Sequence, residues 1–420
     1  MNASSILQSY QHFGVHLGLE RIKQLLEKLD NPHQKVPIIH VAGTNGKGSV
    51  CAYLSSVLTE AGYRVGRYTS PHLIDWTERI CINQQPISPT ELQHYLERVI
   101  AAQNDAETPT QFEIITAVAW LYFAEQKADI AVIETGLGGR LDATNVCENS
   151  LACVITSISL EHWQILGPTV ADIAGEKAGI LKSECPAIIG ELPEAARIAI
   201  EKRIQELHCP ATWVKPATDL GQGFAEYQLS QSAVKIRYKS ALLGKIQLMN
   251  SAIAIATIQT LQNQGWQISQ TAIENGIAKT QWHGRLQQTT WKNRKILIDG
   301  AHNPAASTAL REYVDNFNSY QLPINWVIGI LATKDCDDIL KALLKKGDRL
   351  YLVSVPDQNS TPPAELATLA QIICPELTLC LTFPDLTTAL DIAVADDYLT
   401  VLCGSLYLVG HFLQQQQSQF

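Results

Sequence analysis

The chain has 420 residues, of which 46% are hydrophobic and 17% are charged, and this composition excludes a disordered chain. Its length predicts roughly two or three domains, each with a hydrophobic core of its own. The net charge of −9 disfavours nucleic acid as a partner, because phosphate backbones are bound by clusters of basic residues.

From residue 36 onward, short apolar runs alternate with segments of helical period, which predicts βαβ units around a largely parallel, buried sheet. The clearest strands of the first half are predicted at 37–41, 130–133, 153–156 and 187–189. After residue 290 further strands are predicted at 296–298, 326–330, 350–353, 379–381 and 400–402, with helices near 305–316, 335–346, 363–373 and 385–395. We therefore predict an α/β protein with domains 1–288 and 289–420, divided near the polar stretch 287–294, and a frayed polar tail at 414–417.

The segment after the first predicted strand has the composition of a phosphate-binding loop. It reads HVAGTNGKGS over residues 40–49 and opens a predicted helix that ends near Gly62. Glycines allow backbone N–H groups to turn onto an anion, the helix N-terminus adds its positive end, and a lysine reaches the β- and γ-phosphates. Gly46 comes three positions after Gly43, a shorter spacing than in the common G-x-x-x-x-G-K-[ST] motif. The alternative to a phosphate-binding loop is therefore a plain glycine-rich turn. We predict that ATP is bound by Thr44, Asn45, Gly46, Lys47, Gly48 and Ser49, whose hydroxyl is also a candidate Mg²⁺ ligand.

Cysteine usage and the N-terminus bear on the compartment. The ten cysteines include no C-x-x-C pair, which is typical of reduced, buried thiols in a cytoplasmic protein and not of a zinc site or a disulfide framework. No basic segment followed by an apolar stretch begins the chain, and no apolar run approaches the roughly 18 residues that cross a bilayer. We expect a cytoplasmic monomer without membrane contact.

Several ordered motifs carry a family resemblance. The loop G-T-N-G-K-G-S is similar to the variant found in the Mur ligase superfamily. The segments S-P-H-L at 70–73, T-E-R-I at 77–80 and E-T-G-L-G-G-R-L-D-A-T-N at 134–145 resemble the dihydrofolate synthase and folylpolyglutamate synthase family. Further matches follow in the family's order at 17–21, 110–113, 161–162, 176–180, 284–285 and 299–304.

The resemblance implies a P-loop, Mur-ligase-like ATPase domain followed by a smaller, Rossmann-like α/β domain. It implies an ADP-forming ligase that joins L-glutamate to 7,8-dihydropteroate, and to the γ-carboxylate of tetrahydrofolate polyglutamates, through an acyl phosphate. The substrates would be ATP, L-glutamate and dihydropteroate or reduced folates, with two Mg²⁺ ions. A folylpolyglutamate synthase without the dihydropteroate reaction, a P-loop ATPase that moves a partner, and a non-enzymatic folate binder remain alternatives. A Mur-type amino-acid ligase is disfavoured, because only 42 residues precede Gly43.

The chemistry of amide formation indicates which residues to look for. A carboxylate must be activated, most directly by phosphoryl transfer from ATP, so oxygen ligands and an imidazole are expected around Mg²⁺. Glu134 ends a predicted strand, at the edge where open α/β sheets bind ligands. By resemblance, the metal ligands are Ser70, Glu134 and His162 together with Ser49. The resemblance likewise implies catalytic roles for Lys47, His162, Lys177, Asp299 and His302, and ATP contacts for Asn250, Arg285 and Asp299.

Some of these assignments have structural alternatives. Lys177 resembles the lysine that is carbamylated in the superfamily, and a carbamate would hold the second Mg²⁺; an ordinary helical lysine is the alternative. The alternative for Asp299 is that it is the N-cap of the helix that begins near Pro304. The alternative for Glu134 is that it caps the glycine-rich turn. By resemblance, the pteroate pocket is lined by Leu17, Gly18, Thr110, Gln111, Phe112, Glu113, Arg140, Leu141 and Asp142. Two positions depart from the family's pattern, since His16 stands where an aspartate is common and Gln111 replaces an aromatic residue.

Overall fold

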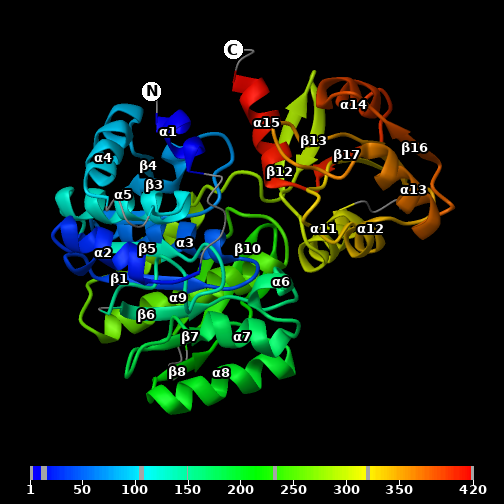
Figure 1. Cartoon of the computed structure of the whole chain (residues 1–420). Helices are drawn as coiled ribbons and strands as arrows, with labels where there is room; N and C mark the ends of the chain where they lie inside the picture. Colours follow the sequence, from blue (N-terminus) through cyan, green and yellow to red (C-terminus); the bar gives the residue numbers. More distant parts are fainter. Residues whose placement is uncertain are drawn as a thin grey trace. The chain divides into compact units, whose positions relative to one another are not determined.

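Strands and helices alternate along the chain as predicted, which confirms the α/β class (Figure 1). The computed structural model describes residues 3–10, 17–103, 108–148, 150–229, 234–317 and 322–417. It divides into one unit of Met1–Ala241 with Gln247–Gln281 and a second of Leu242–Ile246 with Trp282–Phe420. The assignment of separate ligase roles to 1–288 and 289–420 stays a prediction.

The first unit is built on an eight-stranded sheet in the order β4-β3-β2-β5-β1-β6-β7-β8. The strands are β1 (Ile38–Ala42), β2 (Val65–Tyr68), β3 (Ile80–Ile82), β4 (Gln85–Pro86), β5 (Ile130–Glu134), β6 (Ser150–Ile155), β7 (Ala187–Ile189) and β8 (Ala211–Trp213). All neighbours pair in parallel from β2 to β8, and β3 and β4 add an antiparallel edge. Because β1 lies between β5 and β6, the loops that follow these three strands emerge side by side at one sheet edge.

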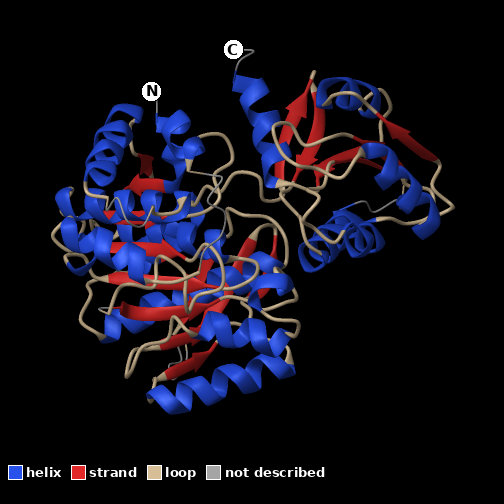
Figure 2. Ribbon diagram, viewed as in Figure 1, coloured by secondary structure: helices blue, strands red, loops and turns tan. Residues whose placement is uncertain are grey.

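Helices surround this sheet, some packed on its strands and others on neighbouring helices (Figure 2). They are α1 (Ala3–Ser9), α2 (Glu20–Lys28), α3 (Lys47–Glu60), α4 (Pro89–Ala101), α5 (Gln111–Glu125), α6 (Trp163–Leu166), α7 (Val170–Ala178), α8 (Glu194–Leu207), α9 (Ile246–Asn263) and α10 (Gln270–Lys279), with short 3₁₀ turns at Pro32–Gln34 and Trp76–Arg79. A small antiparallel sheet of β9 (Thr218–Gly221), β10 (Phe224–Gln228) and β11 (Lys235–Lys239) completes the unit.

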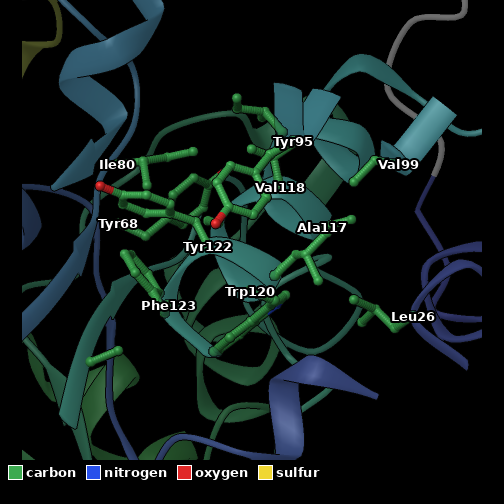
Figure 3. Close-up of a cluster of buried hydrophobic side chains, with 14 of the residues drawn as sticks. Leu26, Tyr68, Ile80, Tyr95, Val99, Ala117, Val118, Trp120, Tyr122 and Phe123 are labelled. Carbon is green, nitrogen blue, oxygen red and sulfur yellow. The ribbon is translucent and has the colours of Figure 1, made fainter. Parts of the chain in front are cut away.

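The core of the first unit surrounds α5. This helix is apolar on every side, as expected of a helix buried all round. Figure 3 shows Tyr122 and Phe123 near Tyr68 and Tyr95, whereas Trp120 lies apart from these two tyrosines. The rings of Tyr95 and Tyr122 meet edge to face, with centroids 5.3 Å apart. Packing of this helix fixes the position of its N-terminus, which carries four of the predicted pocket residues.

The second unit contains a six-stranded sheet in the order β12-β13-β17-β14-β15-β16. Its strands are β12 (Gln287–Trp291), β13 (Arg294–Ile298), β14 (Ile324–Ile328), β15 (Arg349–Leu352), β16 (Leu379–Thr382) and β17 (Leu399–Cys403), and all but the β12 edge are parallel. Its helices are α11 (Pro304–Phe317), α12 (Cys336–Leu343), α13 (Pro363–Ile373), α14 (Leu386–Ala393) and α15 (Leu406–Gln417). The polar stretch at 287–291 is therefore a strand of this sheet.

The expectation of a frayed tail at 414–417 is wrong. These residues continue α15, and Gln416 Nε2 donates to the carbonyl of Thr290 at 2.6 Å. Leu408, Val409 and Phe412 are buried on the apolar face of α15. Because this packing holds the helix in place, the helix continues through the glutamines at its C-terminal end. Among the described residues, no helix is long and apolar enough to cross a membrane.

Candidate active site

The loop after β1 has the geometry of a phosphate-binding loop. It turns through Gly46, whose φ of +87° lies in the left-handed region, and α3 begins at the next residue. No side chain among the described residues caps α3, so the first-turn N–H groups and the positive helix end are left for an anion. A Cβ atom at Gly46 would lie 2.5 Å from Asn250 Oδ1, and this predicted ATP-binding asparagine is therefore packed directly against the loop.

The segment that follows β6 holds this loop in place. Thr44 N donates to the Ser157 carbonyl at 2.7 Å, and Thr156 Oγ1 donates to the Asn45 carbonyl at 2.7 Å. Ser157 Oγ accepts from Asn45 N at 3.1 Å and donates to the Asn45 carbonyl at 3.0 Å. The sequence reasoning missed both hydroxyl residues, although their position at the end of a predicted strand, on the same sheet edge, was an available signal.

Two lysines converge on the carbonyl of Gly43. Lys177 Nζ donates to it at 2.7 Å from α7, and Lys47 Nζ donates to it at 3.1 Å from α3. Lys47 Nζ also lies 4.0 Å from Glu134 Oε1. Lys177 is almost wholly buried, and this burial, with the positive charge of Lys47 beside it, lowers the pKa of Lys177 to about 7. The amine of Lys177 is thus substantially neutral at physiological pH.

Three of the proposed metal ligands come from neighbouring elements at this edge. Glu134 is buried at the end of β5, and its Oε2 accepts a hydrogen bond from Ser70 N at 3.2 Å. Ser70 follows β2 and precedes Pro71 through a cis peptide bond. Ser49 is buried in the first turn of α3, directly after the phosphate-binding loop. The structure thus brings Ser70 and Glu134 into contact, with Lys47 beside them.

His162 occupies a more open position. It precedes α6 with a φ of +52°, its side chain is 45% exposed, and its Nε2 lies 3.9 Å from Glu161 Oε1. Among the described residues, no group of three or more His, Cys, Asp or Glu side chains is arranged to hold a metal ion. Mg²⁺ does not require such a group, because it is usually held by one or two carboxylates together with substrate phosphates and water.

The glycine-rich segment after β5 is organised by Asp142. This fully buried carboxylate accepts hydrogen bonds from Leu137 N at 2.7 Å, Thr144 N at 3.0 Å and Thr144 Oγ1 at 2.6 Å, while burial raises its pKa. The Phe112 ring lies against Gly136, where a Cβ atom would be 2.4 Å from Phe112 Cζ. The structure therefore brings together Phe112 and the segment that contains Asp142, both predicted in the pteroate pocket.

The other predicted pocket residues make contacts of their own. Thr110 and Glu113 form a capping box at the start of α5, and Glu113 Oε2 also pairs with Arg21 Nε at 3.2 Å. Gln111 Nε2 donates to the carbonyl of Leu7 in α1 at 2.7 Å. Arg140 pairs with Glu176 at 2.8 Å, an ion pair that the sequence did not suggest.

At the N-terminal side of the same region, Leu17 is exposed and Gly18, with a φ of +151°, leads into α2. Leu141 is half-buried beside Asp142. His16, whose departure from the family's pattern was noted, lies outside the described residues.

In the second unit, Asp299 follows β13 and is buried. Its Oδ2 accepts from Leu286 N and its Oδ1 from Ala301 N, both at 2.8 Å. Burial raises the pKa of Asp299, and the nearby positive charge of Arg285 opposes that shift. His302 Nδ1 lies 2.7 Å from the Gly300 carbonyl. Asp299, Arg285 and His302 thus belong to one loop region of this unit.

The alternative for Asp299 as a helix cap is wrong. Asn303 Oδ1 accepts from Ala306 N at 2.9 Å, the contact that an N-cap residue makes with the first turn of α11. Asp299 lies too early in the chain for that contact, and it instead binds the backbone of two loops. Its carboxylate is therefore positioned by the loop that follows β13 and by the segment that precedes β12.

Comparisons with known proteins agree over the full length. Residues 41–258 match the Mur ligase middle domain, and residues 282–415 match the dihydrofolate synthetase C-terminal domain. The dihydrofolate synthetase of Saccharomyces cerevisiae is 34% identical, over 96% of this chain and 99% of that protein. The dihydrofolate synthase/folylpolyglutamate synthase of Bacillus subtilis is 38% identical, over 81% of this chain and 82% of that protein. A solved structure of Escherichia coli FolC in complex with DHPP and ADP has a TM-score of 0.83 at 28% identity, covering 100% of this chain and 98% of that one.

Proposed function

The chain belongs to the dihydrofolate synthase/folylpolyglutamate synthase family, and we propose that it ligates L-glutamate to 7,8-dihydropteroate and to the γ-carboxylate of tetrahydrofolate polyglutamates. Both reactions consume ATP and release ADP and phosphate. The observation that carries the proposal is that the phosphate-binding loop and the segment from Glu134 to Asn145 emerge side by side at one sheet edge. A relative of the same fold was solved with both ADP and DHPP, which supports the same pair of ligands here.

Two chemical steps account for the reaction. A carboxylate oxygen of the acceptor attacks the γ-phosphorus of ATP, the bond to the β-phosphate oxygen breaks, and ADP leaves an acyl phosphate behind. The amine of L-glutamate then attacks the carbonyl carbon, phosphate leaves, and the nitrogen loses a proton as the amide forms. Positioning and charge neutralisation supply most of the catalysis in phosphoryl transfer. The α3 N-terminus and Lys47 are placed to provide both.

We propose that Mg²⁺ is held by Glu134 and Ser70, with Ser49 and His162 as further ligands. A buried carboxylate beside a hydroxyl residue suits this hard cation, which takes oxygen ligands and keeps phosphate and water in its shell. When bound, Mg²⁺ would neutralise the charge that develops on the phosphate oxygens. Glu134 also faces Lys47 at 4.0 Å, so one carboxylate orients both the metal and the lysine in this proposal.

We propose that Lys177 is carbamylated. Its buried, largely neutral amine is the form that attacks CO₂, forming a C–N bond and releasing a proton as the carbamate ionises. The product carries a negative charge, suited to a second Mg²⁺ and attractive to Lys47. Carbon-13 spectra of protein equilibrated with ¹³C-bicarbonate should show one carbamate signal that Lys177→Met abolishes. A spectrum without that signal in the wild type would contradict the modification.

For the acceptor, we propose that Phe112 and the 136–142 segment form the wall against which the pterin and aminobenzoyl rings pack. The contact between the Phe112 ring and Gly136 supports this. Because Gly136 has no side chain, the ring of Phe112 lies directly beside the backbone polar groups of the 136–142 segment. Thr110 and Glu113 fix the helix end on which Phe112 stands.

The cytoplasmic location and the monomeric state stay predictions.

The proposal is tested by ADP release and product mass with Mg-ATP and L-glutamate, run in parallel with 7,8-dihydropteroate and with tetrahydrofolate. Glutamate-dependent turnover on both acceptors is the expected result. Turnover on dihydropteroate alone would limit the function to dihydrofolate synthesis, the reaction for which the yeast relative is named. Turnover on tetrahydrofolate alone would limit it to polyglutamylation. ADP release that ignores both acceptors would contradict a ligase and favour a P-loop ATPase.

A further inference from the structure

Two buried cysteines lie in contact at the neighbouring strands β6 and β7. Cys153 belongs to β6 and Cys185 precedes β7, and their sulfur atoms are 3.7 Å apart. Cys153 is inaccessible to solvent and Cys185 is 7% exposed. A third thiol, Cys209, lies at the same end of the sheet and contacts the carbonyl of Lys182 at 3.2 Å. The reaction proposed above uses none of these residues.

The surroundings of the pair favour chemistry at Cys185. The Cys153 thiol beside it and the positive charge of Lys182 lower the pKa of Cys185, although partial burial opposes that shift. Contact with Cys185, together with burial, raises the pKa of Cys153 instead. Reactive cysteines are accessible thiols close to a positive charge, whereas deeply buried thiols are inert until a neighbour is activated. Cys185, which is the more exposed of the two thiols and lies closer to Lys182 in the chain, is thus the thiol that a peroxide reaches first, and Cys153 is the thiol that resolves it.

The pair is also linked to the segments that carry the site. Lys182 Nζ donates to Asn145 Oδ1 at 2.7 Å, and Asn145 Nδ2 donates to the carbonyls of Arg140 and Gly179 at 3.0 Å each. Lys182 therefore connects the turn before Cys185 to the glycine-rich segment. Gly179 in turn follows α7, the helix that carries Lys177.

We propose that Cys153 and Cys185 form a reversible disulfide under attack by a hydroperoxide, and that this disulfide lowers the ligase activity. The Cys185 thiolate attacks one peroxide oxygen, the O–O bond breaks, and the cysteine becomes a sulfenic acid while the other oxygen leaves as water or an alcohol. The Cys153 sulfur then attacks the Cys185 sulfur, the S–S bond forms, and water leaves. Two thiols are oxidised and one peroxide is reduced; a dithiol reverses the reaction.

Closing the bond requires movement in a defined place. The sulfurs must approach from 3.7 Å to about 2.05 Å. Cys153 is held in the sheet, where its N–H donates to the Pro186 carbonyl at 2.9 Å, whereas Cys185 lies in a turn closed by its N–H and the Lys182 carbonyl at 3.2 Å. The turn 182–185 is therefore the part that we expect to move, and its movement disturbs the contact between Lys182 and Asn145. We expect turnover to fall by about tenfold or more, because a displacement of about 1 Å costs up to about a hundredfold in rate.

The experiment treats the full-length reduced enzyme with hydrogen peroxide and maps the thiols by differential alkylation and peptide mass spectrometry. Trypsin separates residues 141–177, which contain Cys147 and Cys153, from residues 183–197, which contain Cys185. A linked pair of these peptides is expected, with fragmentation placing the bond on Cys153. Activity with both acceptors is measured on the same samples, before and after reduction with dithiothreitol.

Matched variants distinguish the pair from general oxidation. Cys185→Ser should abolish both the linked peptides and the loss of activity, whereas Cys209→Ser should change neither. A bond from Cys185 to Cys209 or Cys147, or no bond, would overturn the proposal. A Cys153–Cys185 bond without loss of turnover would overturn the control of activity, which rests on the proposed function. If the reduced enzyme shows no ligase activity, the linked peptides still test the thiol pair, and the proposed function fails separately.

Discussion

Replacing Gly46 by alanine should weaken nucleotide binding, because the free loop then relaxes to avoid two separable costs that ADP binding has to restore. The first is backbone strain, since a residue with a Cβ atom pays about 1–2 kcal/mol to hold the left-handed conformation that Gly46 adopts at a φ of +87°. The second is steric overlap, because the new Cβ atom would lie 2.5 Å from Asn250 Oδ1, and forcing atoms into a packed site costs about 1–3 kcal/mol. Gly46→Ala alone should therefore weaken ADP binding by about 2–5 kcal/mol.

The double variant separates the two effects. Asn250→Ala removes the overlap and leaves the strain, so adding Gly46→Ala to it should cost only about 1–2 kcal/mol, or roughly 5-fold to 30-fold in Kd. The coupling between the two substitutions is then about 1–3 kcal/mol, which exceeds the few tenths expected of independent sites. Titration calorimetry with ADP on the wild type, both single variants and the double variant measures it. Additive costs would refute the packing of Asn250 against the loop.

Other substitutions test the remaining assignments. In CO₂-free buffer, the unfolded chain binds the Lys177 proton more tightly than the folded protein, so the stability of the wild type should rise between pH 7 and about 10.5, by up to about 1.4 kcal/mol per pH unit. Lys177→Met should lack that slope, and parallel melting curves would contradict the buried amine. Glu134→Gln should lower kcat by about 10²–10³-fold, as for the loss of a group that stabilises developing charge; a twofold change would remove it from the metal site. Asp299→Asn should reduce kcat/KM, while Asn303→Ala should cost about 0.5–2 kcal/mol of stability and leave kcat/KM unchanged; equal activity losses would show a shared structural role. Gln111→Phe should lower the KM for dihydropteroate more than that for tetrahydrofolate, and an equal change would place residue 111 outside the pterin contact.

The strands that position the site were predictable because both of their faces are buried. β1 and β5 are buried at every residue, so they appear in the sequence as continuous apolar runs. Once these runs are called parallel strands, the segments that follow them must emerge at the same edge, which brings the phosphate-binding loop close to Glu134. The sequence reasoning found Glu134 from its place at the end of a strand, and it found the phosphate-binding loop from its glycine-rich motif.

Exposed and long-range features were less accessible. Every residue of β9 is exposed, and β12 is a polar edge strand, so neither gives an apolar run. α15 extends through glutamines because its apolar face is packed, which the polar composition at 414–417 conceals. The contact of Lys177 with the Gly43 carbonyl spans 134 positions and has no local signal. The contact between Lys177 and Gly43 depends on how α7 packs beside β1. The contact between Cys153 and Cys185 likewise depends on the packing of β6, so neither contact can be read from the sequence.

Activation of the acceptor carboxylate as an acyl phosphate is the step that couples ATP to amide formation. Dihydropteroate labelled with ¹⁸O in its carboxylate tests this most directly, in a reaction with Mg-ATP and L-glutamate. Each phosphate released should carry one ¹⁸O atom, visible as an isotope shift in the ³¹P spectrum, and phosphate and dihydrofolate should form in equal amounts. Phosphate without label, formed at the same rate in the absence of the acceptor, would rule out an acyl phosphate and leave ATP hydrolysis alone.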